Sequence, residues 1–275
     1  MESVVEKLIT QSQEKHYGKY RGEVVDNNDP ENRARVKLTV STILDSQVES
    51  HWAEPCLPFG GLADQGLFVV PEKGAELWVE FEAGDLNHPI WTGTTWKKKG
   101  DAPKEAADRS PHMRQLKTPS GQILSFDDTK GEEQIRLFHP SKAELLINPA
   151  GTVQLTDGAG ATLVMTAGEK PFIEITDSHG NSMLTNASGT TVTDRNGNKI
   201  VMEGGGVKIS SSAAVTIKGS VVNVGGAGGE PLIKGQSFLS LFATHMHTCT
   251  APGSPSSPPI PQGEFSTLST TGMVK

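Results

Sequence analysis

The sequence predicts an all-β protein in which a small barrel is followed by an elongated, repetitive β segment and a short Pro-rich apex. Three observations support this class. All four tryptophans and both tyrosines lie before residue 97, so the head of the chain carries most of its aromatic residues. Sixteen of the 30 glycines lie within residues 151–236, a stretch also rich in Thr, Ser and Val. The last 45 residues contain only two basic and one acidic side chain.

Composition excludes several classes of protein. The 275 residues allow one large domain or two modest ones. A formal charge of −7 predicts no general phosphate-binding surface, and 35% hydrophobic residues with 17 prolines disfavour a large helical enzyme. No apolar run approaches the roughly 18 residues of a membrane-spanning helix. The N-terminus lacks a signal-peptide pattern, and Cys56 and Cys249 suggest no disulfide framework, so synthesis in a reducing cytosol is expected.

Residues 1–16 are predicted to form a separate N-terminal arm. Val4, Val5, Leu8 and Ile9 have helical spacing, which predicts a short amphipathic helix or an arm that orders against a partner. A disordered terminus is the alternative.

Residues 17–96 are predicted to form a β-barrel. Residues 20–25 form the first strand, and residues 26–30 form a turn rich in Asp, Asn and Pro. Apolar residues alternate with polar ones over 34–40 and 77–81, which is the period of half-buried strands, and 90–93 form a last strand. About five strands in this length suit an OB-type barrel.

The same residues resemble a known family. The segments GKYRGEVVDNNDPENRARVKLTV (18–40), PCLPFGG (55–61) and GLFVVPEKGAELWVEFEAGDLNHPIWTGTTW (66–96) resemble the OB domain of phage central-spike proteins and type VI secretion spike proteins. After a predicted linker over 97–116, the segment KTPSGQILSFDDTKGEEQIRL (117–137) resembles the entrance to the β-helical needle of the same spike proteins. The resemblance implies a β-helical shaft over 117–236.

A degenerate repeat runs through the predicted shaft. Thr-Asp pairs at 156–157, 176–177 and 193–194 each begin a Gly-containing turn that leads into a short β run. Their spacing of 20 and 17 residues indicates an elongated β structure built by repetition. A plain antiparallel meander is the alternative.

The shaft sequence also favours an intertwined homotrimer. Between His139 and Ser237 the only aromatic residue is Phe172, so a single copy buries too little apolar area to offset its chain entropy. Three copies around one axis remove the exposed sheet edges and share a narrow core. That core is expected to contain Val153, Leu155, Leu163, Ile173, Ile175, Val192, Ile200, Val207, Ile209, Val215 and Ile217. The spike families are trimers of this kind.

Residues 237–275 are predicted to form the apex, which contains the candidate metal site. In an extended segment His245 and His247 point to the same side, about 6–7 Å apart. A threefold axis supplies six imidazoles, which suit one octahedral transition-metal ion per trimer, iron in preference to zinc. This motif resembles the metal-bearing apex of phage spikes. Surface histidines without a metal are the alternative, and Cys249 is a further candidate ligand.

No catalytic residues are assigned, and the protein is expected not to be an enzyme. The sequence contains no nucleophile-elbow, zinc-protease, P-loop or dinucleotide-binding motif. Asp127 and Asp128 form a possible carboxylate pair or calcium site, but a structural role at a strand–turn junction is favoured. The interval between barrel and shaft is too short for an inserted lysozyme domain.

The resemblance implies a central spike that sheath contraction drives through a target cell envelope. Expected partners are two further copies of the chain, a separate hub protein of the baseplate, the inner tube and a tip-capping protein, but not nucleic acid. The expected location is a virion tail baseplate or an assembled injection particle. An OB-fold module that binds oligosaccharide or single-stranded nucleic acid is the alternative, and a wall hydrolase is a third.

Overall fold

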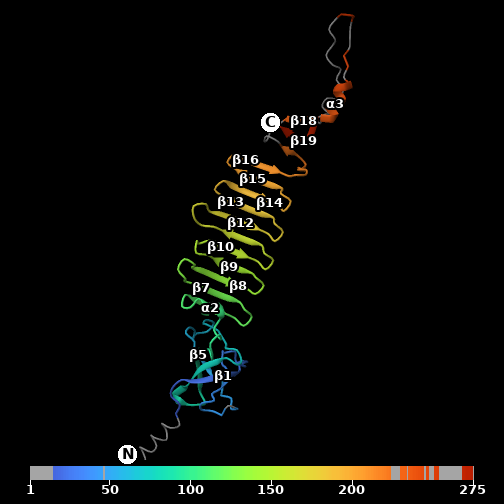
Figure 1. The fold of residues 1–275 in the computed structure, drawn as a ribbon. Helices are drawn as coiled ribbons and strands as arrows, with labels where there is room; N and C mark the ends of the chain where they lie inside the picture. Colours follow the sequence, from blue (N-terminus) through green and yellow to red (C-terminus); the bar gives the residue numbers. More distant parts are fainter. Residues whose placement is uncertain are drawn as a thin grey trace, which may run out of the picture. The chain divides into compact units, whose positions relative to one another are not determined.

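The computed structural model describes residues 15–45, 47–223, 230–233, 235–244, 246–247, 251–253 and 268–274 (Figure 1). Residues 1–14, which include most of the predicted arm, therefore lie outside the described residues. The chain divides into two compact units, Met1–Gly151 and Thr152–Lys275. The first contains a barrel and the beginning of a strand meander, and the second contains a longer meander and a small C-terminal sheet. None of the helices in the described residues is long and apolar enough to cross a membrane.

The barrel consists of five strands. They are β1 (Tyr20–Asp26), β2 (Lys37–Thr39), β3 (Glu54–Pro55), β4 (Glu76–Phe81) and β5 (Pro89–Thr95), arranged in the order β2-β1-β4-β5-β3. A short 3-10 turn, η1 (Glu82–Gly84), joins β4 to β5. An isolated bridge between Val36 and Ala53 links the two edges of this order, so the sheet curls back onto itself.

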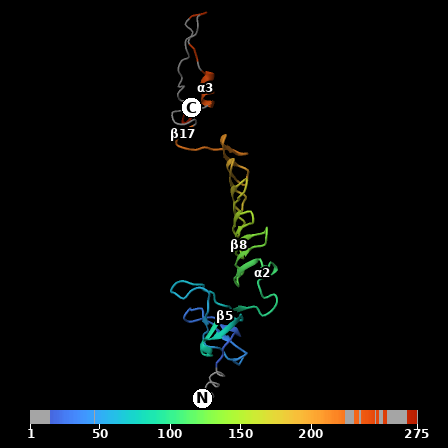
Figure 2. The ribbon, with the colours of Figure 1, turned by 90° about the vertical axis from the view of Figure 1, so that its left-hand side faces the viewer.

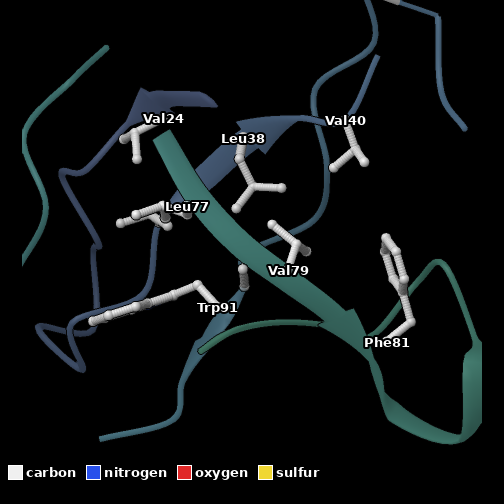
Figure 3. Close-up of a cluster of buried hydrophobic side chains, with 9 residues drawn as sticks. Val24, Leu38, Val40, Leu77, Val79, Phe81 and Trp91 are labelled. Carbon is white, nitrogen blue, oxygen red and sulfur yellow. The ribbon is translucent and has the colours of Figure 1, made fainter. Parts of the chain in front are cut away.

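Alternating side chains fill the inside of the barrel. Every second residue of β4 is buried, namely Leu77, Val79 and Phe81, as the period-two pattern predicts. Figure 3 shows these residues facing the apolar side chains of β1, β2 and β5. The buried cluster consists of Val24, Val36, Leu38, Val40, Ala53, Leu77, Val79, Phe81 and Trp91.

The predicted linker contains regular structure. Helix α2 (Lys104–Asp108) begins after Pro103, whose carbonyl accepts the amide of Ala107 at 2.9 Å. Strand β6 (Met113–Lys117) follows, so the meander begins before residue 117, where the shaft was expected to begin. Three antiparallel partners continue it in the first unit: β7 (Ile123–Asp127), β8 (Gln134–Phe138) and β9 (Glu144–Ile147).

The second unit continues as a meander in which sheet order follows chain order. Its strands are β10 (Val153–Thr156), β11 (Thr162–Met165), β12 (Phe172–Thr176), β13 (Ser182–Asn186), β14 (Gly189–Thr193), β15 (Lys199–Glu203) and β16 (Gly206–Ser210). Each pairs with the next in antiparallel register (Figure 1). Viewed from the side in Figure 2, these strands form a single layer. Within one copy the strand order is therefore that of an antiparallel meander, which was the alternative to the predicted elongated repeat structure.

The Thr-Asp repeat forms equivalent five-residue turns. The Oδ1 atoms of Asp157, Asp177 and Asp194 each accept the backbone amides of the residues two and four positions later, at 2.8–2.9 Å. The glycine at the fourth position has a φ between +86° and +93°, a conformation that other residues rarely adopt. The carboxylate therefore supplies an acceptor that the turn backbone would otherwise lack.

Further turns of this kind precede the recognised repeat. In one, Oδ1 of Asn148 accepts the amide of Ala150 at 3.0 Å, and Gly151 at the fourth position has a φ of +75°. In two others the first residue is neither Asp nor Asn. Thr118 and His139 take the place of the aspartate, because the Oγ1 of Thr118 accepts the amide of Gln122 and the Nδ1 of His139 accepts that of Ser141. The glycine position is occupied by Gly121 in one turn and by Lys142, at a φ of +72°, in the other. The repeat thus begins in the first unit.

The described C-terminal residues form a three-stranded sheet. Strand β19 (Leu268–Val274) lies between β17 (Val222–Asn223) and β18 (Glu230–Ile233). Helix α3 (Gly235–Thr244) contains the apolar run 237–243, for which the sequence analysis assigned no helix. Phe238 and Phe242, one turn apart, stack with ring centroids 6.0 Å apart.

Candidate functional site

The most prominent surface feature of the second unit is one predominantly apolar, uncharged face of its meander. Residues directly opposite each other on neighbouring strands share a face, so the strand registers divide the side chains of β10–β16 into two sets. One set, here called the apolar face, consists of Val153, Leu155, Leu163, Met165, Ile173, Ile175, Met183, Thr185, Thr190, Val192, Ile200, Met202, Val207 and Ile209. It contains no charged residue.

The apolar face is exposed in a single copy of the chain. Ten of its side chains are between 38% and 65% exposed, including Ile175 at 50% and Ile209 at 58%. The opposite face is mainly polar: Gln154, Thr156, Thr162, Val164, Phe172, Glu174, Thr176, Ser182, Leu184, Asn186, Gly189, Thr191, Thr193, Lys199, Val201, Glu203, Gly206, Lys208 and Ser210. A sheet with one apolar and one polar face requires a cover on the apolar side.

The predicted shaft core coincides with this face in part. Nine of the eleven residues expected to form a shared core lie on the apolar face. The other two, Val215 and Ile217, lie in an irregular stretch after β16 and are 51% and 70% exposed. The expectation that these residues lack a core within one chain agrees with their exposure.

The meander of the first unit has the same two-faced character. One face contains Leu116, Leu124, Phe126, Ile135, Leu137, Leu145 and Ile147, together with Arg114. Of these, Leu116 and Leu137 are more than half exposed. On the other face Ile123, Ser125 and Asp127 are buried, at 2–5% exposure.

Asp127 has the structural role predicted for it. Its Oδ1 accepts the hydroxyl of Thr129 at 2.6 Å and the Thr129 amide at 3.0 Å, and its Oδ2 pairs with Arg109. The Thr129 hydrogen bonds and the Arg109 charge hold the pKa of this carboxyl below its usual value. Asp128 points elsewhere and pairs with Arg114, so the two carboxylates do not form a joint site.

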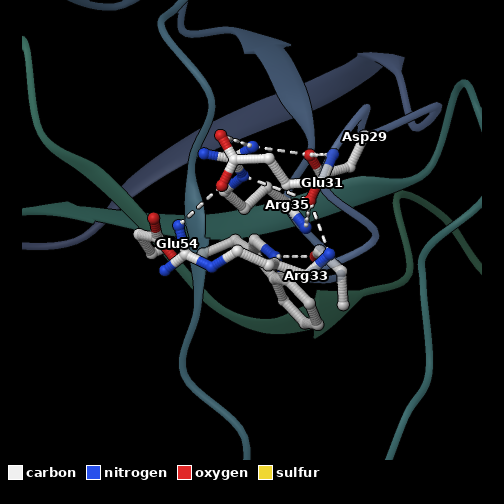
Figure 4. Close-up of polar contacts among 7 residues, drawn as sticks. Asp29, Glu31, Arg33, Arg35 and Glu54 are labelled. Atoms are coloured by element: carbon white, nitrogen blue, oxygen red, sulfur yellow. Dashed lines mark hydrogen bonds and ion pairs between the residues drawn. The ribbon is translucent and has the colours of Figure 1, made fainter.

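A buried ion pair shapes the first turn of the barrel. The Asp29 carboxylate accepts Nη2 of Arg35 at 2.7 Å and Nε at 3.1 Å, and it also accepts the amides of Glu31 and Arg33 (Figure 4). The bidentate Arg35 contact lowers the pKa of Asp29 and raises that of Arg35. Nearby, the Ala34 carbonyl accepts the indole N–H of Trp91, which ties this turn to the barrel core.

The outer side of β1 is charged but balanced. Lys19 pairs with Glu80 at 2.8 Å, Arg21 with Glu76 at 2.5 Å, and Lys97 with Glu23 at 2.5 Å. Since each of these cations faces a carboxylate, this side of the barrel presents no basic stripe to a nucleic-acid backbone.

The predicted metal site falls largely outside the described residues. His245 and Cys249 lie outside them, and the exposed side chain of His247 follows the end of α3 at Thr244. Within the described residues of one chain, no three potential ligands from His, Cys, Asp and Glu come together. One imidazole has suitable donor chemistry, but one described ligand does not make a site.

Comparisons with known proteins agree with the barrel. Residues 20–96 match the family model of the type VI secretion system/phage-baseplate injector OB domain. The chain is also 33% identical over 101 residues to the "Type VI secretion system spike protein VgrG3" of Vibrio cholerae. That match includes 35% of this chain but only 10% of the relative, so the chain spans a small part of that protein.

These findings confirm the predicted resemblance to phage and type VI secretion spike proteins. They also confirm the all-β class with an N-terminal OB domain, and the long antiparallel sheet is consistent with a β-helix or β-prism. A structural role in a baseplate or spike is supported. The two-faced registers of the meander were not predicted, although the alternation of apolar residues from Val153 onward contained that signal.

Proposed function

We propose that the protein is the homotrimeric central spike of a contractile tail or injection machine. The observation that carries this proposal is the apolar face of β10–β16, exposed in one copy and free of charge. Burying a large aliphatic side chain stabilises by about 1.5–3 kcal/mol. Three copies that turn their apolar faces inward would bury this surface and leave the polar faces in water.

The proposed mechanism is mechanical. Backbone pairing and a shared apolar core would make the shaft rigid, and sheath contraction would drive it through the target envelope. Exposed strand edges would be paired between copies. No catalytic step is part of this mechanism.

Sedimentation over a dilution series tests the assembly. We expect a single assembled species down to low concentration and no folded monomer, because one copy lacks a core in the meander. A compact monomer that retains the β signal would contradict the proposal.

We also propose that the N-terminal arm and the barrel dock on a separate hub protein. The first described residues lie at this side of the barrel, where the amide of His16 donates to the Gly84 carbonyl at 2.9 Å. Deletion of residues 1–15 should weaken hub binding while the assembly stays intact. Loss of the assembly would mean that the arm serves the contacts between copies instead.

At the apex we propose one transition-metal ion, iron in preference to zinc, held by His245 and His247 of three copies. Threefold symmetry would supply the donors that one chain lacks. The double variant His245→Ala, His247→Ala should lose the metal and retain the assembled shaft. Elemental analysis of untagged protein tests this, and substantially less than one metal per three chains in the wild type would contradict it.

The alternative binding function has a distinct test. Binding of single-stranded DNA that weakens with salt would favour an OB module for nucleic acid. The paired cations on the outer side of β1 disfavour that result.

A further inference from the structure

The barrel carries a second exposed apolar surface on the loop between β3 and β4. Residues 57–69, here called the barrel loop, contain one charged residue, Asp64. Five of its large apolar side chains are 45–73% exposed: Phe59, Leu62, Leu67, Phe68 and Val69. This density of exposed apolar side chains in one loop indicates an interaction surface.

The barrel loop has its own internal order. The amide of Leu67 donates to the Phe59 carbonyl at 3.0 Å. At Gly66, whose φ is +146°, an added Cβ would lie 3.0 Å from the Cα of Gly60, so the two arms of the loop approach closely. A groove of about 1300 Å³ lies between this loop and the turn at Asn32–Ala34. The surface is therefore shaped before a partner arrives.

Hydrogen bonds show that the segment after the barrel loop, residues 71–76, lies at the same end of the barrel as Thr95, the last residue of β5. After the loop, the Pro71 carbonyl accepts the side-chain amide of Asn27, and the amide of Gly74 donates to Val24. Strand β4 then begins at Glu76, directly opposite Thr95 at the end of β5. His16 lies at the other end of β4, beside Gly84.

We propose that the barrel loop docks on a second copy of this chain, an inference that rests on the proposed assembly. The loop lacks the charges needed to pair with a strongly charged partner, whereas a second copy offers exposed apolar surface of the same chemistry. That surface is the charge-poor face of β6–β9, which begins within 20 residues of Thr95 in the sequence. The end of the barrel proposed to meet the hub is the opposite one, where His16 lies.

Photo-crosslinking of the purified full-length chain tests the inference without any other protein present. A benzophenone amino acid replaces Phe59 or Phe68 in two separate variants, and Tyr17 in a matched control. Tyr17 is 70% exposed on the same barrel but lies next to His16. We expect covalent dimers and trimers from the first two variants and only monomers from the control on a denaturing gel. Light scattering on the same samples gives the number of copies before irradiation.

The outcomes separate this inference from the proposed function. An assembled trimer without intermolecular crosslinks at positions 59 and 68 would overturn the docking surface and leave the spike proposal intact. A monomer would overturn both. In a second assay, the variant Phe59→Ser, Phe68→Ser should exchange subunits about tenfold faster than the wild type, and Tyr17→Ser should not. Unchanged exchange would contradict the inference.

Discussion

At the residue scale, single side chains close the turns of the meander. The Asp177 carboxylate accepts two backbone amides and, through Oδ2, the side-chain amide of Asn181 at 2.6 Å. Asp194 and Asn198 repeat the arrangement at 2.7 Å. The carboxylates accept backbone amides of the turn that have no carbonyl partner in the hairpin and would otherwise bind water. They therefore stabilise the five-residue turn.

The first prediction concerns this acceptor. In Asp177→Ala the amides of His179 and Asn181 lose their partner, so their hydrogen exchange should become about fivefold faster. The exchanged pair Asp177→Asn, Asn181→Asp serves as the control, because it retains an acceptor oxygen at position 177 and only reverses the side-chain hydrogen bond between the two residues, so its exchange should stay close to the wild type. Equal exchange in all three proteins would show that the carboxylate does not hold the turn.

The second prediction concerns pH. The side-chain amide of Asn181, followed by its backbone amide, lowers the pKa of Asp177 from 3.8 to about 2. Because the folded pKa lies below the unfolded one, the stabilisation is complete above about pH 4 and is lost as pH falls toward 2. The amide chemical shift of His179 should therefore titrate with a midpoint near 2. In Asn181→Ala the midpoint should move toward 3.8, and a wild-type midpoint already near 3.8 would contradict the account.

The residue types at the turns also explain why the earliest turns of the repeat were not predicted. The Asp-x-x-Gly turns were recognisable because carboxylate acceptors and positive-φ glycines are the usual residues at these positions. The turn at 139–143 uses an imidazole nitrogen and the positive φ of Lys142 instead, and neither residue type indicates such a turn. The repeat was therefore predicted to begin at Thr156, although turns of this kind begin at Thr118.

At the element scale, successive residues of a strand lie on opposite faces of the meander, and only one of these faces is apolar and needs a cover. In β15, Ile200 lies on the apolar face and its neighbour Val201 on the polar face, although both are β-branched aliphatic residues. A one-residue difference in the chain thus separates a proposed buried position from a solvent-facing one.

The third prediction uses this pair. Ile200→Lys should abolish assembly, because three ammonium groups would enter a shared core without partners. Val201→Lys, the matched control, should assemble normally and melt within a few degrees of the wild type. Sedimentation velocity measures the first effect and circular dichroism the second. Equal behaviour of the two variants would refute the assignment of the faces.

Some elements were predictable from the sequence, and others were not. The alternation in β4 identified its buried residues correctly, since a barrel interior imposes a period of two. Helix α3 was not predicted, although Phe238, Leu239, Leu241 and Phe242 have the i, i+1, i+3, i+4 spacing of an amphipathic helix; the run was interpreted only as a short apolar stretch. Strand β6 was assigned to a linker because the preceding prolines and charges extend up to it.

At the scale of the whole molecule, the two units differ in how they achieve stability. The barrel buries nine core residues within one chain. The meander of the second unit instead leaves its apolar side chains exposed, so its stability is proposed to come from other copies.

The fourth prediction concerns the two parts as separate fragments. A fragment of residues 15–97 should fold as a monomer, with a cooperative thermal transition and dispersed amide resonances. A fragment of residues 152–223 at micromolar concentration should either assemble or precipitate, and a soluble folded monomer would contradict the account.

The central claim is that three copies of the chain share the apolar face of β10–β16. Multi-angle light scattering of the untagged full-length protein tests it most directly. The account predicts a mass three times that of the 29.3 kDa chain, unchanged on tenfold dilution. A monodisperse folded species with the mass of one chain would contradict it.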